Sequence, residues 1–281
     1  MSGEHAITTL CRVLKVNRST YYKFINRLPS NREKENQRIR TCIADLYAKA
    51  DKRLGYGKIA LCLSRDYRIN ISGGRVYRLM KEMNLPKMST VRLFKPCKSS
   101  KDENGDCVNI LSQQFNQSSP NRVWVCDFTY IRVGRRFYYL CAIMDLYARK
   151  IIAYGISNRI DTQLAINTLN AAVAERGKSE GVIFHTDRGC QFTSKCFRKH
   201  LEVLGMIQSF SKKGHPYDNA VMECFFKYLK KEETDRRTYL TPQELMLSLF
   251  KYIDRFYNSV RPHSHNNGLS PNECEFLFFS S

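Results

Sequence analysis

The chain has 281 residues, of which 43% are hydrophobic, so it is long enough to bury a substantial core and to form two domains. Its formal net charge of +20 and isoelectric point of about 9.6 predict a polyanionic partner, most often nucleic acid. Eleven cysteines at irregular spacing, with no C-x-x-C pair and no matching histidine cluster, argue against a disulfide framework and against a zinc site.

The charge is distributed unevenly along the chain. Residues 1–100 carry 22 Lys and Arg against 7 Asp and Glu, a net charge of +15, whereas residues 101–281 carry 24 against 19, a net charge of +5. The first third is therefore the stronger electrostatic anchor. No apolar run reaches membrane length, and the first residues contain no apolar signal segment. We therefore expect a soluble, intracellular protein with no membrane partner.

The first predicted elements are two short helices in residues 7–28, "ITTLCRVLKVNRSTYYKFINRL". Asn17 or Ser19 is suited to cap the second helix, because a side-chain oxygen there can accept a free backbone N–H. The pattern suits a DNA-binding helix-turn-helix. A plain helical hairpin has the same spacing, so the pattern alone does not decide between them.

A longer helical segment follows, with one amphipathic helix over residues 36–50 and two more within residues 54–85, separated by a polar turn at Ser72. The last of these helices has an inward apolar stripe consisting of Val76, Leu79, Met80 and Met83. Its outward face carries Arg75, Arg78 and Lys81. A charged outer face usually serves only solvation, but a face of one sign in a basic region favours contact with DNA.

Residues 98–122 are rich in Ser, Asn and Gln and are typical of a linker. After them the hydrophobic period changes to two, which indicates strands. The predicted strands cover residues 122–133, 137–146, 150–157, 181–187 and about 206–210, and the predicted helices cover 161–177, 194–204, 219–235 and 241–263. Short connections make the first three strands antiparallel, and a helical crossover makes the fourth parallel to a neighbour. Together they predict an α/β sheet covered by helices.

Three acids stand out against this background. Asp127 lies in the middle of the apolar, aromatic first strand, where Asp is disfavoured and an unpaired buried charge is costly. Asp187 ends the fourth strand, a position where open α/β sheets bind ligands. Glu223 lies at the edge of the buried face of its helix, five residues after Asp218, which we expect to cap that helix.

These three acids, on two strands and a helix, are able to meet at one point. Hard oxygen ligands of this kind suit Mg²⁺ or Mn²⁺, and two such ions about 3.5–4 Å apart stabilise the attacking and leaving oxygens of a phosphodiester. Each acid also has a structural alternative: Asp127 as a buried hydrogen-bonded acid, Asp187 as a turn residue, and Glu223 as a surface ion-pair partner. The pattern alone leaves both interpretations open.

The helix that carries Glu223 also carries a basic stripe. Around the helical wheel Lys227, Lys230 and Lys231 follow Glu223, beside the inward stripe of Met222, Phe225, Phe226 and Leu229. The lysines either follow the phosphate backbone of DNA beside a metal site or form ordinary intrahelical ion pairs, such as Glu223 with Lys227.

The order and spacing of several long motifs resemble one known family. The motifs "VWVCDFTYI", "HTDRGCQFTS", "KKGHPYDNAVMECFFKYLKKE" and "YNSVRPHSHNNGLSPNE", with 35 residues between Asp187 and Glu223, are similar to those of bacterial insertion-sequence transposases of family three. The chain looks like their second-frame product, OrfB, and the resemblance extends from "LCRVLKVNRSTYYK" to "LSPNE". A retroviral-integrase-type DDE core is typical of this family.

The resemblance implies a ribonuclease H-like fold in which Asp127, Asp187 and Glu223 are the catalytic and metal-binding residues for two Mg²⁺ or Mn²⁺ ions. It implies cleavage and strand transfer at the terminal inverted repeats of an insertion sequence, with element-end and target DNA as partners. It also implies self-association on DNA, an upstream OrfA product or frameshift fusion, and a bacterial, cytoplasmic, nucleoid-associated location. Asp145 matches a family Asp that we interpret as structural, and His185, Asn219 and Lys230 are candidate supporting or DNA contacts.

The expected domains are a helix-turn-helix-type DNA-binding region over residues 1–97, a linker over 98–121, a catalytic core over 122–235 and a helical extension over 236–281. Two other functions use the same residues. One is a ribonuclease H-like nuclease that does not join strands, and the other is a non-catalytic DNA-binding regulator derived from a decayed transposase. The basic helical region argues against the first, and the intact acid triad argues against the second.

Overall fold

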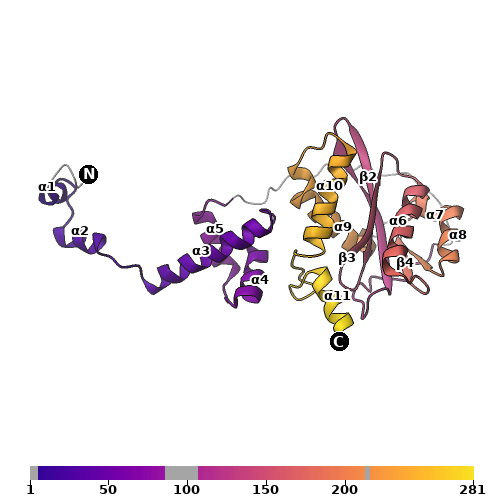
Figure 1. Cartoon of the computed structure of the whole chain (residues 1–281), viewed down its shortest axis with the longest axis horizontal. Helices are drawn as coiled ribbons and strands as arrows, with labels where there is room; N and C mark the ends of the chain where they lie inside the picture. The colour runs from indigo at the N-terminus through magenta and orange to yellow at the C-terminus, as the bar shows by residue number, and fades with distance from the viewer. Residues whose placement is uncertain (1–5, 86–106, 213–215) are drawn as a thin grey trace.

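The computed structural model describes residues 6–85, 107–212 and 216–281, which form a helical N-terminal region and an α/β core (Figure 1). The helices of the N-terminal region are α1 Ile7–Val13, α2 Arg18–Ile25, α3 Asn31–Lys49, α4 Tyr56–Tyr67 and α5 Gly73–Glu82. The predicted all-α region before the core is therefore confirmed. The first two helices bury little, since Cys11 is the single buried residue among their described positions.

Polar side chains fix where these helices begin. The side chain of Asn17 accepts the backbone N–H of Ser19 at 3.1 Å, so Asn17 is the cap of α2. Helix α3 begins five residues earlier than predicted because Ser30 and Glu33 form a reciprocal capping box. The side chain of Ser72 accepts the N–H of Arg75 and begins α5 at the predicted turn.

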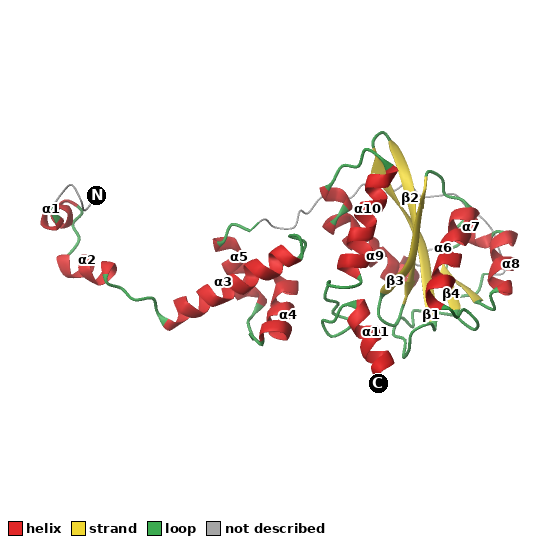
Figure 2. Ribbon diagram, viewed as in Figure 1, coloured by secondary structure: helices red, strands yellow, loops and turns green. Residues whose placement is uncertain are grey.

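The α/β core contains a mixed five-stranded sheet with the order β3-β2-β1-β4-β5 (Figure 2). Its strands are β1 Val123–Val133, β2 Arg136–Asp145, β3 Lys150–Ser157, β4 Ile183–Thr186 and β5 Ile207–Phe210. The first three strands pair antiparallel, and β4 runs parallel to both β1 and β5. The predicted strand order in the chain and the predicted pairing directions are both confirmed.

Helices cover both faces of the sheet (Figure 2). The helices of the core are α6 Thr162–Arg176, α7 Cys190–Thr193, α8 Lys195–Val203, α9 Ala220–Glu232, α10 Pro242–Tyr252 and α11 Pro271–Ser280. Alternate residues of β1 enter two different hydrophobic clusters, with Val123 and Val125 on the side of α9 and α10, and Trp124 and Cys126 on the side of α6 and α8. The alternation of apolar residues along β1 thus separates the two halves of the core.

The helical region shares its hydrophobic core with the face of the sheet that α9 and α10 cover. A single cluster of buried residues includes Ile43 of α3, Ile59 of α4 and Val76 of α5, and it also includes Phe225 of α9 and Tyr252 of α10. Helices α3–α5 therefore pack against the α/β core and do not have a separate hydrophobic core of their own.

The last predicted long helix is wrong at its C-terminal end. Helix α10 begins at Pro242 with Thr241 as its cap, as predicted, but it ends at Tyr252 and is followed by a π-helical segment, Ile253–Tyr257. Proline disfavours a helical conformation in the residue before it, so Arg261, which precedes Pro262, lies outside the helix. Its guanidinium group is instead buried against the carboxylate of Glu232, at 2.8 Å.

Residues 107–121 are the described part of the predicted linker, and residues 108–111 among them lie beside β5 at the edge of the core. The backbone N–H of Phe210 donates to Val108, and the hydroxyl of Ser209 accepts the N–H groups of Ile110 and Leu111. A segment rich in polar side chains has the composition of a solvated linker, yet here its backbone groups form hydrogen bonds with β5. The predicted linker residues 98–106 lie outside the described residues, and the three boundaries between the four expected regions remain predictions.

The described cysteines are all free thiols, and Cys126 and Cys141 lie side by side on β1 and β2 with their sulfur atoms 3.5 Å apart. Across the three described segments, no helix is long and apolar enough to cross a membrane.

Candidate active site

Asp127 lies on β1 opposite Ala142 of β2, on the face that packs against α9. Strand β4 pairs with β1 only over Val123–Val125, so β1 continues past the end of its neighbour at this point. One carboxyl oxygen of Asp127 accepts the N–H of Phe128 at 2.7 Å. Burial of the carboxyl group, followed by the charge of Asp187, raises the pKa of Asp127 to about 8.

Asp187 follows the last residue of β4 directly, at the carboxyl end of a parallel strand. Its side chain is half-buried and accepts the N–H of Gly189 at 3.0 Å. Burial raises the pKa of Asp187, and the hydrogen bond from Gly189 opposes that rise only in part. The parallel pairing of β4 with β1 is what brings Asp187 next to Asp127, sixty residues earlier in the chain.

Glu223 lies in the first turn of α9. The residue is exposed, yet partial burial of its carboxyl group raises the pKa of Glu223. Among the residues that the structure describes, Lys227 forms no ion pair with it, and no other cation does. The intrahelical ion pair that offered an ordinary explanation for this acid is thus not formed there.

The three acids share one electrostatic environment. The charges of Asp187 and of Glu223 both raise the pKa of Asp127. In the described parts of the chain, no group of three His, Cys, Asp or Glu side chains lies close enough together to hold a metal ion. The donor set itself still fits a hard divalent cation, since it consists of carboxylates whose mutual repulsion such a cation would relieve.

Asp218 does not cap α9, so that prediction is wrong. The N-cap position is Asn219, whose side chain forms no capping hydrogen bond. Asp218 is buried and accepts hydrogen bonds from the N–H of Lys212 and from the side-chain amides of Asn109 and Gln113, at 2.7, 2.8 and 2.8 Å. Its carboxylate therefore ties the start of α9 to the segment that runs beside β5, a long-range role that no local pattern signals.

His185 and Asp145 are enclosed by hydrogen bonds. The ring of His185 is fully buried and bonds the hydroxyls of Ser209 and Ser211 at 2.9 and 3.1 Å. Burial lowers the pKa of His185 to about 4, so the ring is neutral near pH 7. Asp145 is also fully buried and accepts two backbone N–H groups, in keeping with the structural role we assigned to it.

The three lysines of α9 face different surroundings instead of forming one row. Lys227 is exposed to solvent. Lys230 lies over the ring of Tyr130, with its ammonium nitrogen 4.6 Å from the ring centre, and lines a cavity of about 450 Å³. Lys231 lines a different cavity, of about 650 Å³, between α9 and the helical region. The helical wheel predicted which side of α9 carries the lysines, but it did not predict which residues of other elements surround each lysine.

The three predicted basic contacts of α5 also differ. Arg75 is committed to α3, since its guanidinium group bonds the side chains of Glu35 and Asn36 at 2.7 and 2.8 Å. Arg78 and Lys81 are exposed. Lys81 lines the same 650 Å³ cavity as Lys231, so one candidate DNA contact from each region borders this space.

Comparison with known families identifies the class of protein. Residues 34–92 match the HTH-like domain, and residues 117–216 and 204–271 match two descriptions of the integrase core domain. The HTH-like match falls on α3–α5 and not on the α1–α2 hairpin, where we had considered a helix-turn-helix. The predicted mixed α/β integrase core preceded by a helix-turn-helix-type region is confirmed, and these two domains imply that the protein binds DNA.

Curated relatives identify the family. The chain is 32% identical over 276 residues to the transposase InsF for insertion sequence IS3A of Escherichia coli, covering 97% of this chain and 95% of that protein. It is 32% identical over 251 residues to the transposase for insertion sequence element IS904 of Lactococcus lactis, covering 89% and 98%. The chain belongs to the IS3 family of bacterial insertion-sequence transposases, enzymes with an integrase core domain.

The core is also similar to solved structures of retroviral integrases. The catalytic core domain of HTLV-2 integrase in complex with magnesium aligns with a TM-score of 0.41 and 16% identity, covering 56% of this chain and 98% of that domain. A simian T-cell lymphotropic virus intasome aligns with a TM-score of 0.45 and 16% identity, covering 83% and 74%.

Proposed function

We propose that Asp127, Asp187 and Glu223 are the catalytic residues with which this transposase cuts DNA at the ends of an insertion sequence and joins those ends to target DNA. The observation that supports this proposal is electrostatic. Two acids that are distant in sequence raise the pKa of a third acid, which lies on the central strand. A protein gains no stability from gathering like charges in this way, and acids with pKa values raised by one another are concentrated at functional sites.

The same three carboxylates would hold the metal, Mg²⁺ or Mn²⁺, and we propose two ions. Divalent cations bound there would stabilise the charge on the attacking and leaving oxygens of a phosphodiester. The chain's own contribution is to position these carboxylates. Asp187 is oriented by the N–H of Gly189, and Asp127 by the N–H of Phe128. Glu223 would complete the set through a change of its side-chain conformation or of the first turn of α9.

DNA would approach along the basic side of the molecule. Arg78 and Lys81 on α5 are exposed, and Lys81 shares a cavity with Lys231 of α9. This supports a path for the phosphate backbone from the HTH-like domain to the acids. We propose the terminal inverted repeats of the element as the DNA bound first and target DNA as the second. Self-association on DNA and an upstream OrfA product or fusion belong to the same proposal.

The test is strand transfer with labelled element-end DNA and Mg²⁺. Asp127→Asn, Asp187→Asn and Glu223→Gln each remove one ligand charge with little change of shape, so each should abolish cleavage and joining while end binding in a mobility-shift assay stays near the wild-type level. Glu202→Gln, an exposed acid on α8, is the matched control and should keep full activity. Wild-type joining by any of the three variants would contradict the proposal. Cleavage without joining by the unmodified chain would identify a nuclease, and neither activity would identify a DNA-binding regulator.

A further inference from the structure

The cavity of about 450 Å³ beside Lys230 lies at the far end of the same two elements that carry Asp127 and Glu223. Tyr130 is three residues beyond Asp127 on β1 and therefore belongs to the opposite face of that strand. Lys230, seven residues beyond Glu223 on α9, lies over its ring. At about 3.3 Å per strand residue and 1.5 Å per helix residue, both elements extend about 10 Å from the acids to the cavity. The cavity and the acids are therefore fixed to one another by two rigid elements.

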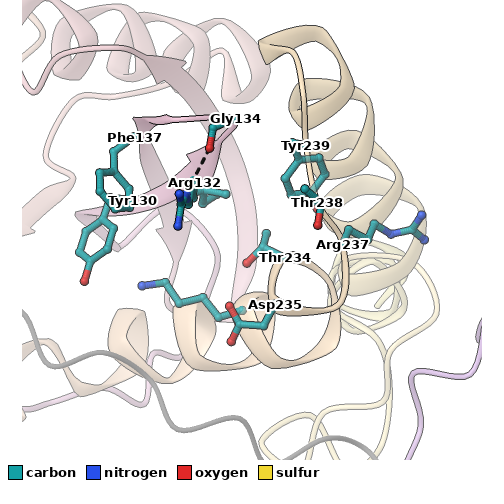
Figure 3. A pocket seen from close by; sticks show the side chains of 11 residues that line it. Tyr130, Arg132, Gly134, Phe137, Thr234, Asp235, Arg237, Thr238 and Tyr239 are labelled. Atoms are coloured by element: carbon teal, nitrogen blue, oxygen red, sulfur yellow. Dashed lines mark hydrogen bonds between the residues drawn. The ribbon is translucent and has the colours of Figure 1, made fainter.

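One wall of the cavity is aromatic (Figure 3). The rings of Tyr130 and Phe137 meet edge to face, with their centres 5.4 Å apart and their planes at 86°. Phe137, near the start of β2, is 51% exposed. An edge-to-face pair holds both rings in place while leaving ring surface available to a planar group. A half-exposed Phe in a basic protein is suited to stack on a nucleic-acid base.

Two cations flank this wall. Lys230 lies over the ring of Tyr130. Arg132 is exposed, and its Nε donates to the carbonyl oxygen of Gly134 at 3.1 Å (Figure 3). Within the described segments neither of them forms an ion pair with an acid. Asp235 is the one acid among the lining residues. Arg237 also borders the cavity, but its guanidinium group points away from Arg132 and binds Glu233 at 2.7 Å (Figure 3).

We propose that this cavity receives one nucleotide of the element-end DNA whose base has left the double-helical stack, with the base against Phe137 and Tyr130 and its phosphate between Lys230 and Arg132. The inference rests on the proposed catalytic role of the three acids. A strand advances about 3.4 Å per nucleotide, so a distance of about 10 Å places this nucleotide about three positions from the reacting phosphate. A free nucleotide has the same chemistry, but the alignment of the cavity with the acids favours a nucleotide within the DNA strand.

Photo-cross-linking with the full chain tests the location. Element-end duplexes carry 5-iodouracil at one terminal position at a time, and the cross-linked peptide is identified by mass spectrometry. The cross-link should reach Tyr130 or Phe137 from a position about three nucleotides from the cleavage site. Cross-links confined to other parts of the chain, or the absence of any, would overturn the inference. Excess deoxynucleoside monophosphate should not abolish the DNA cross-link, and a cavity that only the monophosphate occupies would also overturn it.

Affinity provides a second and independent test. A duplex with an unpaired base at the cross-linked position should bind the Asp127→Asn chain more tightly than the fully paired duplex does. Phe137→Ala should remove at least about fivefold of that preference, the lower end of what one base stacked on an aromatic ring contributes. Phe276→Ala removes an even more exposed aromatic, 70% against 51%, on α11, and it should leave the preference unchanged. Equal effects of the two variants, or none, would refute the stacking role.

These measurements need no catalysis, so they separate the two proposals. The cross-link and the affinity difference are read in the Asp127→Asn chain, which should bind DNA without cutting it. Active acid variants would refute the catalytic proposal alone, whereas a missing cross-link together with inactive acid variants would refute only the nucleotide cavity.

Discussion

Arg53 of the helical region donates a hydrogen bond from Nη2 to Oε2 of Glu233, just beyond the end of α9, at 2.7 Å, and both side chains are buried. The guanidinium group also lies 5.1 Å from the ring centre of Phe256. Glu233 accepts a further hydrogen bond from the hydroxyl of Ser248, at 2.6 Å. This ion pair fastens the HTH-like domain to the C-terminal end of the helix whose first turn carries Glu223.

Arg53→Ala should destabilise the protein by about 3 kcal/mol, because it leaves the carboxylate of Glu233 buried without its main counter-ion. Arg237 and Ser248 still contact Glu233, so we expect a value at the low end of the range for broken buried pairs. Chemical denaturation monitored by circular dichroism measures the change in the free energy of unfolding.

The matched control is Arg159→Ala, which removes an exposed arginine and should change stability by less than about 0.5 kcal/mol. The double variant Arg53→Met, Glu233→Gln should regain part of the lost stability, because it removes the uncompensated charge. If Arg53→Ala unfolds at the same denaturant concentration as the control, the ion pair does not fasten the two regions.

Stabilisation by Mg²⁺ should increase with pH. Without metal, the pKa of Asp127 is raised to about 8, so the group is mostly protonated below that pH and must lose its proton before it can bind a cation. The rise in melting temperature on adding Mg²⁺ should therefore be larger near pH 8 than near pH 6. Calorimetry in buffers of different ionisation enthalpy should detect proton release on binding.

The metal-free protein provides the control for this prediction. Because the folded-state pKa of Asp127 lies above its ordinary value of 3.8, the folded state holds a proton that the unfolded state has lost, and stability falls as pH rises between these values. The side chain of Asn cannot titrate. In EDTA, the melting temperature of Asp127→Asn minus that of the wild type should therefore increase as pH rises from about 4 to 8. A constant difference across this range would show that Asp127 is not perturbed.

Neutralising the exposed cations of α5 should weaken DNA binding without unfolding the protein. Arg78→Ala and Lys81→Ala should each lower affinity for all sequences and reduce the slope of log affinity against log salt by about one. Arg75→Ala should instead cost stability, because Arg75 is bonded to Glu35 and Asn36. The full chain is the right material, because α3–α5 share their core with α9 and α10. Unchanged salt slopes would remove this helix from the DNA interface.

The lysines of α9 should contribute to joining through separate surfaces. Lys230→Ala and Lys231→Ala should reduce strand-transfer yield more than they reduce melting temperature, and part of the loss should be recovered at about 25 mM salt compared with about 150 mM. Their combined effect should be close to additive, since they line different cavities. Lys251→Ala, an exposed lysine on α10, serves as the control. If the strand-transfer yields of both variants equal that of Lys251→Ala at every salt concentration, Lys230 and Lys231 serve only solvation.

Local patterns predicted the strands and helices well but did not predict contacts between distant segments. The alternation around Asp127 identified both faces of β1, because a strand has a period of two whatever it packs against. The bond from Asn109 to Asp218 and the packing of residues 107–121 on the core depend on residues about a hundred positions apart. The buried ion pair between Arg261 and Glu232 likewise depends on an arginine that looks, in sequence, like any surface cation.

The candidate site was predictable to a similar extent. Strand ends and a helix edge indicated which acids could meet, and the resemblance to a family indicated that they do. What sequence could not show is that Glu223 lies close enough to influence Asp127 while the three carboxylates remain too far apart to hold a metal ion in the described residues. Nor could it show that Lys230 and Lys231 border different cavities, since a helical wheel carries no information about neighbouring elements.

The shared core has a consequence for how the protein is made. Helices α3–α5 leave the ribosome early, but the apolar surface they bury is completed by α9 and α10, which are synthesised more than a hundred residues later. The buried partners of Arg53 are likewise Glu233 and Phe256, near the end of the chain. A ribosome that stops early therefore releases a chain that has neither the third acid nor a closed core. Proteolysis of such fragments would limit the cell's supply of DNA-binding domains detached from their catalytic partner.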